Sequence, residues 1–283
     1  MTTTTDPDLV ALSRRAWGAL EAVHAVGYFA PENTQAYVEL GLHPRLSYFA
    51  ARSAAFGPAG PEIAVATFYV FAPRLVAKAL PSSWQVATPD RVQQARRDGT
   101  SAALQRILGA PDVSEALAIA RRVCDRLTAH GRPLYAAHAA LDWPDDDLLA
   151  LWHAATLVRE HRGDGHVSVL QAAGLDPVES LVLGGLFSGN TEFVKKTRGW
   201  TDEEWAAAEE RLRGRGLLLG EGGLSEDGHA LRQQVEDQTD ALAVEGWAGV
   251  GPDECRRLVE LASPLREQVL SSGDLPEWMS KRG

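Results

Sequence analysis

The sequence has 283 residues, of which 45% are hydrophobic, and a formal net charge of −10. This length is enough for one large domain or two modest domains that each bury a core. The acidic balance argues against non-specific attraction to nucleic-acid phosphates or anionic lipids. No apolar run approaches the ~18 residues that a bilayer-spanning helix needs.

Two cysteines, Cys124 and Cys255, lie far apart within helical patterns. This usage is typical of a reducing compartment, and we expect both to be buried packing residues. The N-terminal stretch MTTTTDPD lacks the basic and apolar regions of a signal peptide. The sequence therefore predicts a soluble, cytoplasmic protein that does not enter a membrane.

Apolar residues recur at intervals of three and four along most of the chain, which indicates helices. Thr88 followed by Pro89 predicts a helix start, and Gly131 followed by Pro133 predicts a helix end. Up to residue 162 we expect helices over 7–27, 32–41, 44–54, 61–70, 73–80, 89–108, 112–130, 133–141 and 145–162.

After Pro177 the pattern changes to a helix, a short helix, a third helix, a β-wing and a fourth helix. This is the order of a winged helix-turn-helix. A helix that ends in LxxRGL, followed by a glycine-rich hairpin and a further helix, resembles the scaffold of MarR-type regulators. Such a resemblance implies a fold and says little about function. One more helix is expected from Gly251 onward.

We therefore predict a mainly all-α chain that contains a degenerate MarR-like winged helix with a small β-wing. The predicted parts are an N-terminal helical domain over 1–142, the winged helix-turn-helix-like domain over 143–250, and a C-terminal helix and tail over 251–283.

Four stretches carry a resemblance over the whole chain: EAVHAVGYFAPE (21–32), YFAARSAAFG (48–57), ATFYVFAP (66–73) and REHRGDGH (159–166). With them the chain resembles an actinobacterial family of helical proteins that carry a MarR-like helix-turn-helix segment. The resemblance implies a fold without a chemistry.

The charge of the predicted winged helix argues against DNA binding. A reading helix puts its N-terminal residues into the major groove and relies on Lys and Arg to neutralise phosphates. Here those residues are Thr201, Asp202, Glu203 and Glu204, and residues 178–243 hold seven Lys or Arg against thirteen Asp or Glu. We interpret the basic KKTRG stretch as a solvated turn, and we expect DNA not to be a partner.

The stretch REHRGDGH, Arg159 to His166, places polar groups directly after a long apolar pattern. One interpretation is a helix junction, in which Gly163 ends the helix that begins near Asp145 and Asp164 caps the next helix. This interpretation leaves four side chains without a role: Glu160, His161, Arg162 and His166.

The alternative interpretation of the same stretch is a site. A His beside a carboxylate forms a pH-tunable acid–base pair, and a nearby Arg binds a carboxylate or phosphate. His153 and Glu160 share a helix face, while His161 is rotated by about 80° from His153. We expect Glu160 or His161 to face inward and His166 to approach across the turn.

The sequence gives little support to a metal or haem centre. The spacings of HExxH, paired CxxC and haem-attachment motifs are missing from it. His153, Glu160, His161 and His166 are ligand types without such a spacing, and Asp145, Asp146 and Asp147 suit a helix N-terminus. We assign no metal ligand and no cofactor, and haem or metal binding stays an alternative.

The N-terminal helices add further candidates. Glu21, His24 and Tyr28 follow helical spacing and form a polar stripe on an apolar helix, and Tyr48 and Arg52 are four residues apart. Tyr69 belongs to an aromatic run. A cavity lined by aromatic rings with a few polar groups suits a small organic ligand.

These residues lead to a first hypothesis of small-molecule binding, with acid–base chemistry as its enzymatic form, at the junction of the two helical halves. The acid–base candidates are His161, Asp164, His166, Glu160 and His24. The ligand-binding candidates are Arg162, Tyr28, Tyr48, Arg52 and Tyr69. A second hypothesis is a MarR-like, ligand-responsive transcription regulator, and a third is an interaction protein that meets a basic partner with its acidic winged face.

Overall fold

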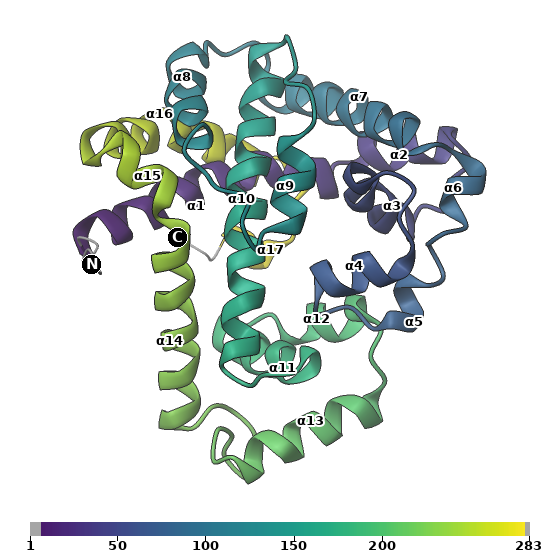
Figure 1. Ribbon diagram of the computed structural model, residues 1–283, viewed down its shortest axis with the longest axis vertical. Coiled ribbons are helices and arrows are strands. Elements are labelled where there is room, and N and C mark those ends of the chain that lie inside the picture. The colour runs from purple at the N-terminus through teal and green to yellow at the C-terminus, as the bar shows by residue number, and fades with distance from the viewer. Residues whose placement is uncertain (1–6, 281–283) are drawn as a thin grey trace.

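The computed structural model describes residues 7–280, so the N-terminal threonine run lies outside the described residues. The described chain is built from helices (Figure 1), which confirms the all-α prediction. The first nine are α1 Pro7–Phe29, α2 Pro31–Glu39, α3 Ser47–Ser53, α4 Pro61–Phe68, α5 Pro73–Val76, α6 Ser83–Val86, α7 Pro89–Leu108, α8 Ser114–Cys124 and α9 Pro133–Ala139. The others are α10 Asp147–Ala172, α11 Pro177–Ser188, α12 Thr191–Arg198, α13 Asp202–Gly214, α14 Glu226–Ala243, α15 Glu245–Val250, α16 Pro252–Ser271 and α17 Glu277–Ser280.

Helix α10 runs through the middle of the molecule and contacts α1, α7, α8, α9 and α14 (Figure 1). It begins as expected, because the Asp146 side chain accepts a hydrogen bond from the Leu149 amide at 2.8 Å. Buried residues follow on every side of this helix. Most polar side chains in the middle of this helix therefore face other parts of the protein instead of solvent.

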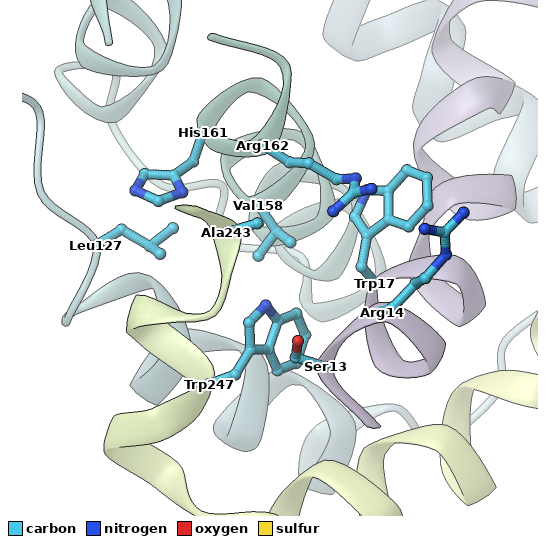
Figure 2. A pocket seen from close by; sticks show the side chains of 9 residues that line it. All are labelled: Ser13, Arg14, Trp17, Leu127, Val158, His161, Arg162, Ala243 and Trp247. Carbon is cyan, nitrogen blue, oxygen red and sulfur yellow. The ribbon is translucent and has the colours of Figure 1, made fainter. Parts of the chain in front are cut away.

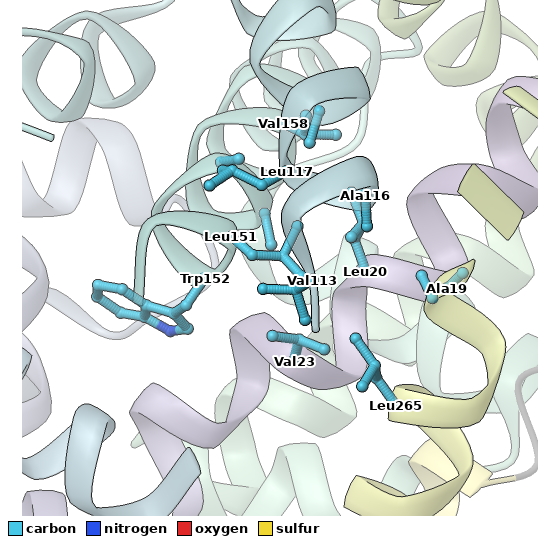
Figure 3. Packing of buried hydrophobic residues seen from close by; sticks show 14 of the residues in the cluster. Ala19, Leu20, Val23, Val113, Ala116, Leu117, Leu151, Trp152, Val158 and Leu265 are labelled. Carbon is cyan, nitrogen blue, oxygen red and sulfur yellow. The ribbon is translucent and has the colours of Figure 1, made fainter. Parts of the chain in front are cut away.

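The first hydrophobic core surrounds the N-terminal half of α10. Figure 3 shows Leu20 and Val23 of α1, Leu117 of α8, Leu151 of α10 and Leu265 of α16 packed together. Helix α16 lies along α1, so the two ends of the described chain meet in one core. The predicted domain boundaries at 142 and 250 stay predictions, and this core takes side chains from both sides of each.

Helices α2 to α7 enclose a second, aromatic core with Phe49, Phe68 and Phe71 at its centre. Helix α2 crosses α7 closely at Gly99, where an added Cβ would lie 2.8 Å from the Asn33 Cα. Only glycine allows this approach.

Helices α11 to α13 form a third core around Leu183, Trp205 and Leu212. Capping boxes begin α11 at Asp176 and α13 at Thr201. In the described chain the expected wing is reduced to one antiparallel bridge between Leu218 and Leu224. The segments 217–219 and 223–225 are short and lie next to several glycines, which are unfavourable in strands.

The turn between α4 and α5, residues 69–72, fastens the second core to the third. The Tyr69 hydroxyl donates to the Leu175 carbonyl at 2.5 Å, and Trp200 Nε1 donates to the Val70 carbonyl at 2.9 Å. The Ala72 amide donates to the Arg198 carbonyl at 2.9 Å. Tyr69 adopts a φ of 54°, an unfavourable value for a non-glycine residue, and these bonds hold it there.

Candidate functional site

The stretch Arg159 to His166 lies inside α10, so the prediction of a helix junction is wrong. Gly163 does not end the helix, and Asp164 does not cap a following one. Glycine in a helix costs about 1 kcal/mol relative to alanine, and packing along α10 outweighs that preference. At Gly165 an added Cβ would lie 2.6 Å from Arg132 Nη1, so this glycine makes room for a neighbouring side chain.

One of these residues, Glu160, is the centre of a buried polar cluster. Its side chain is 0% exposed and accepts hydrogen bonds from Arg52 Nη2 at 2.7 Å and Arg52 Nε at 3.1 Å. The Tyr28 hydroxyl donates to it at 3.0 Å, and Arg159 Nη1 at 3.1 Å. Two guanidinium groups and a phenol thus share one carboxylate.

These neighbours set the ionisation of the cluster. Burial by itself would raise the pKa of the Glu160 carboxyl, but Arg52 and Arg159 outweigh burial and hold that pKa well below its usual range. Burial and the Glu160 charge raise the pKa of the Tyr28 phenol. Glu160 is therefore a carboxylate and Tyr28 a neutral donor at neutral pH.

Tyr28 and Tyr48, which helical spacing in the sequence singled out, both lie at this cluster. Arg52 Nη1 donates to the Tyr48 hydroxyl at 3.2 Å across one turn of α3. The Tyr28 and Tyr48 rings meet edge to face with centroids 5.3 Å apart, and Tyr48 lies 5.6 Å from Phe71.

Arg198 of α12 completes the cluster, and the sequence interpretation missed it. Its guanidinium lies 4.6 Å above the Phe71 ring and 5.6 Å from the Phe193 ring. Burial lowers the pKa of the Arg198 guanidinium, and the nearby charges of Arg52 and Arg159 lower it further. The interpretation of KKTRG as a solvated turn is wrong, because Lys195 to Arg198 form the last turn of helix α12; Lys196 is exposed there and Arg198 is half-buried. We call Tyr28, Tyr48, Arg52, Arg159, Glu160 and Arg198 the Glu160 cluster.

His24 lies beside the cluster, with its ring 4.8 Å from that of Tyr28. Its Nδ1 is 3.0 Å from the Thr156 hydroxyl, which itself donates to the Trp152 carbonyl at 2.9 Å. His24 Nδ1 therefore carries the proton. Burial and Arg159 lower the pKa of this imidazole well below its usual value, so it is neutral.

His161 and Arg162 point away from the Glu160 cluster and line a small pocket between α1, α10, α14 and α15 (Figure 2). Figure 2 shows Arg162 lying against Trp17, and its guanidinium is 4.5 Å from that ring. Arg162 Nη1 is also 2.6 Å from Asp240 Oδ1, so its charge is offset. Burial lowers the pKa of His161 to about 3, and the imidazole is neutral.

Three further candidates serve other contacts. Asp164 accepts a hydrogen bond from the Tyr135 amide at 2.9 Å in the first turn of α9, so it caps a helix other than the expected one. His166 Nδ1 lies 2.9 Å from the Thr239 hydroxyl on α14. It does not approach His161 across a turn, because both residues belong to one helix. Tyr69 lies outside the Glu160 cluster, at the Leu175 carbonyl.

The arginines of α13 all pair with carboxylates of the same chain. Arg211 bonds Glu179 at 3.0 Å and also Asp176. Arg213 bonds Glu209 at 3.2 Å and Glu210 at 3.0 Å, and Arg215 bonds Glu179 at 3.2 Å.

The N-terminus of α13 is engaged as well. Arg74 of α5 donates to Glu204 through Nη1 at 2.8 Å and through Nη2 at 2.5 Å, and its Nη2 also reaches the Gly199 carbonyl at 2.7 Å. The first turn of α13 carries Asp202, Glu203 and Glu204. This end of α13 is therefore acidic and is held by α5.

A comparison with known families matches nearly the whole chain. The profile of a helix-turn-helix family matches residues 13–276. The chain belongs to this helix-turn-helix family. The match includes the N-terminal helices, so the family is defined by nearly the whole chain. No curated protein and no solved structure matches the chain.

Between residues 7 and 280, groups of three or more His, Cys, Asp or Glu side chains arranged to hold a metal ion are absent. Within the same range, each helix is too short or too polar to cross a membrane. Cys124 and Cys255 are both buried and free, as expected.

Proposed function

We propose that this helix-turn-helix family protein binds a small organic anion at the Glu160 cluster. We further propose that helices α11 to α13, in the order of a degenerate MarR-like winged helix, supply Arg198 to that site instead of reading DNA. The observation that carries the proposal is the position of Arg198, a half-buried guanidinium that lies against aromatic rings and lacks a carboxylate partner among residues 7–280.

The charge balance of the cluster favours an anion. Arg52 and Arg159 bond to Glu160, Arg198 lies near enough to both arginines for their charges to lower its pKa, and Glu21 lies 3.8 Å from Arg159. Three positive charges meet two negative ones, and burying an uncompensated charge is unfavourable. A carboxylate or phosphate ester would offset the surplus and would accept the two-pronged hydrogen bonds that arginine offers.

The surroundings of Arg198 favour an anion that is also partly aromatic or apolar. Phe71 and Phe193 lie under its guanidinium, and the half-buried rings of Tyr28 and Tyr48 continue from Phe71. A planar group on the ligand would stack on these rings while its charged end meets the arginine. Because Arg198 comes from α12 and the tyrosines come from α1 and α3, such a ligand would join the two halves.

Simple binding fits these side chains better than acid–base catalysis. The pKa of Glu160 is lowered by two arginines, that of Tyr28 is raised by burial, and that of His24 is lowered by burial. General acids and bases work best with a pKa near the operating pH. Asp164, whose pKa burial raises to about 6, is occupied by the Tyr135 amide on another side of α10.

The proposal is tested by thermal-shift titration with benzoate, phenyl phosphate and succinate at constant chloride and ionic strength, with neutral benzamide as the matched control. Benzoate or phenyl phosphate should raise Tm in a saturable way, and benzamide should not. Arg198→Met, which keeps the packing on Phe71, should abolish the rise, whereas Lys196→Met on the exposed side of α12 should retain it. Equal responses of the two variants, or no response of the wild type to any of the three anions, would overturn the proposal.

A second candidate function is a DNA-binding transcription regulator, and membership in a helix-turn-helix family favours it. Against it stand the acidic first turn of α13 and the pairing of Arg211, Arg213 and Arg215 with internal carboxylates. Fluorescence anisotropy with DNA from upstream of the protein's own coding sequence decides between them. Saturable, submicromolar binding that weakens steeply with salt would establish the second candidate in place of the first.

A further inference from the structure

Arg96 of α7 is a buried cation without a counter-ion in the described part of the chain. Arg96 is 1% exposed. Nη1 donates to His138 Nε2 at 3.1 Å, and His138 Nδ1 donates to the Leu134 carbonyl at 2.9 Å. His138 therefore presents the lone pair of a neutral ring, which accepts a hydrogen bond and leaves the positive charge of Arg96 in place.

The ionisation of His138 agrees with this geometry. Burial and the Arg96 charge lower the pKa of His138 to about 4. The rings of Trp152 and Tyr28, with centroids 5.1 Å and 5.6 Å from the Arg96 guanidinium, stabilise the cation partly. Burying a guanidinium still costs several kcal/mol unless an anion accompanies it.

Arg96 lines a cavity between α7, α9 and the N-terminal half of α10. Its lining includes Gln93, Arg96, Arg97, His138, Asp142 and His153. Arg96 Nε, Arg96 Nη2 and Gln93 Nε2 are buried donors that lack a hydrogen-bond partner among residues 7–280. Buried donors are rarely left unsatisfied, so their gathering at one cavity indicates an acceptor that fills it.

The electrostatics of the cavity favour a negative acceptor over a water molecule. Arg96 and Arg97 add positive charge, and together with Arg121 they lower the pKa of His153, which burial lowers most, to about 3. Asp142 is the one carboxylate among the lining residues, and it is exposed at the rim, without an ion pair to either arginine in the described structure.

We propose that this cavity binds one monovalent anion of about the size of chloride, held by Arg96 and Gln93. The free volume of the cavity is about 10 Å³, which is the scale of a single water-sized particle. This volume excludes the organic anion proposed for the Glu160 cluster. The site adjoins that cluster at the Tyr28 ring but is lined by different residues, and its anion would stabilise the crossing of α7 with α9 and α10.

The direct test is the ³⁵Cl NMR line width of a chloride solution with the wild-type protein. A bound, exchanging chloride should broaden the line, and added bromide should narrow it by competition. Replacing gluconate by chloride at constant ionic strength should also raise Tm by about 2 °C or more. Absence of both effects would mean that water fills the cavity, and the proposal would be overturned.

Variants assign the effect to this cavity. Arg96→Met should remove both responses, and Arg91→Met, at an exposed position of the same helix, should keep them. Arg198→Met should also keep them, which separates this site from the Glu160 cluster. If Arg96→Met does not fold, Asp142→Asn serves instead: the chloride responses should persist in it. A lower Tm of Asp142→Asn, with no chloride dependence in either protein, would identify Asp142 as the counter-ion and overturn the proposal.

Discussion

Replacing Glu160 by Gln should destabilise the protein strongly, because Glu160 is the buried partner of two arginines. Its side chain is 0% exposed, that of Arg52 is 8% exposed, and two hydrogen bonds of 2.7 and 3.1 Å join them. The amide keeps the shape of the carboxylate and removes its charge. Removing one partner of a buried pair costs about 3–5 kcal/mol, since the other charge stays buried without compensation.

The chain contains a matched control for this substitution. Glu254 and Arg122 also make bonds of 2.7 and 3.1 Å through Nη2 and Nε, but their side chains are 38% and 44% exposed. Solvent screens such a pair, so Glu254→Gln should cost no more than about 1 kcal/mol. Because the two ion pairs have the same hydrogen-bond distances, the difference in stability between the two variants measures the effect of burial.

Urea denaturation at pH 7 measures the free energy of unfolding of both variants, and thermal denaturation measures their Tm, with circular dichroism at the helix band as the readout. At roughly 2 °C per kcal/mol for a chain of this size, Tm should fall by about 6–10 °C in Glu160→Gln and by about 2 °C or less in Glu254→Gln. Equal losses in the two variants would refute the reasoning that burial makes the Glu160 cluster critical to stability.

Three further predictions concern α10 and the turn that holds α12. Burial raises the pKa of Asp164 from 3.8 to about 6, so the contribution of Asp164 to stability should fall by up to about 3 kcal/mol as pH rises from 4 to 6; the free energy of unfolding of Asp164→Asn minus that of the wild type should therefore rise over this range in urea titrations. The pKa of His161 is lowered from 6.5 to about 3, so its contribution to stability changes with pH in the opposite direction. Stability should fall as pH drops below 6.5, and His161→Gln should reduce this fall. Trp200→Phe removes the 2.9 Å bond to the Val70 carbonyl and should cost about 1 kcal/mol. Hydrogen exchange of the Ala72 amide should then quicken while exchange in α1 stays constant; unchanged exchange at Ala72 would show that this turn does not fasten α12.

Several members of the Glu160 cluster were predictable from local spacing. Tyr48 and Arg52 are four residues apart in one helix, and their side chains do bond to each other. Tyr28 was predicted from the polar stripe on α1 and does reach Glu160. Periodicity works here because helical geometry alone decides which neighbours share a face.

The sequence alone failed where packing overrides local preference. Gly163 and Gly165 suggested a helix end, and both are helical within α10. Arg198 looked like part of a solvated turn, yet it packs on Phe71, a residue 127 positions away. Nothing in the local pattern of KKTRG indicates that aromatic partner.

The sequence by itself determined that the chain is helical, that its cysteines are free and buried, and that α13 begins with acids, because apolar periodicity, capping and charge act over a few residues. Only the tertiary structure decided that α10 continues through REHRGDGH and sends Glu160, His161, Asp164 and His166 to different partners. A side chain's direction follows from its helix, but what it meets there depends on helices far away in the chain. The burial and the neighbouring charges that set the pKa of Glu160, and that leave Arg96 without a counter-ion in the described part of the chain, arise only when those helices pack together.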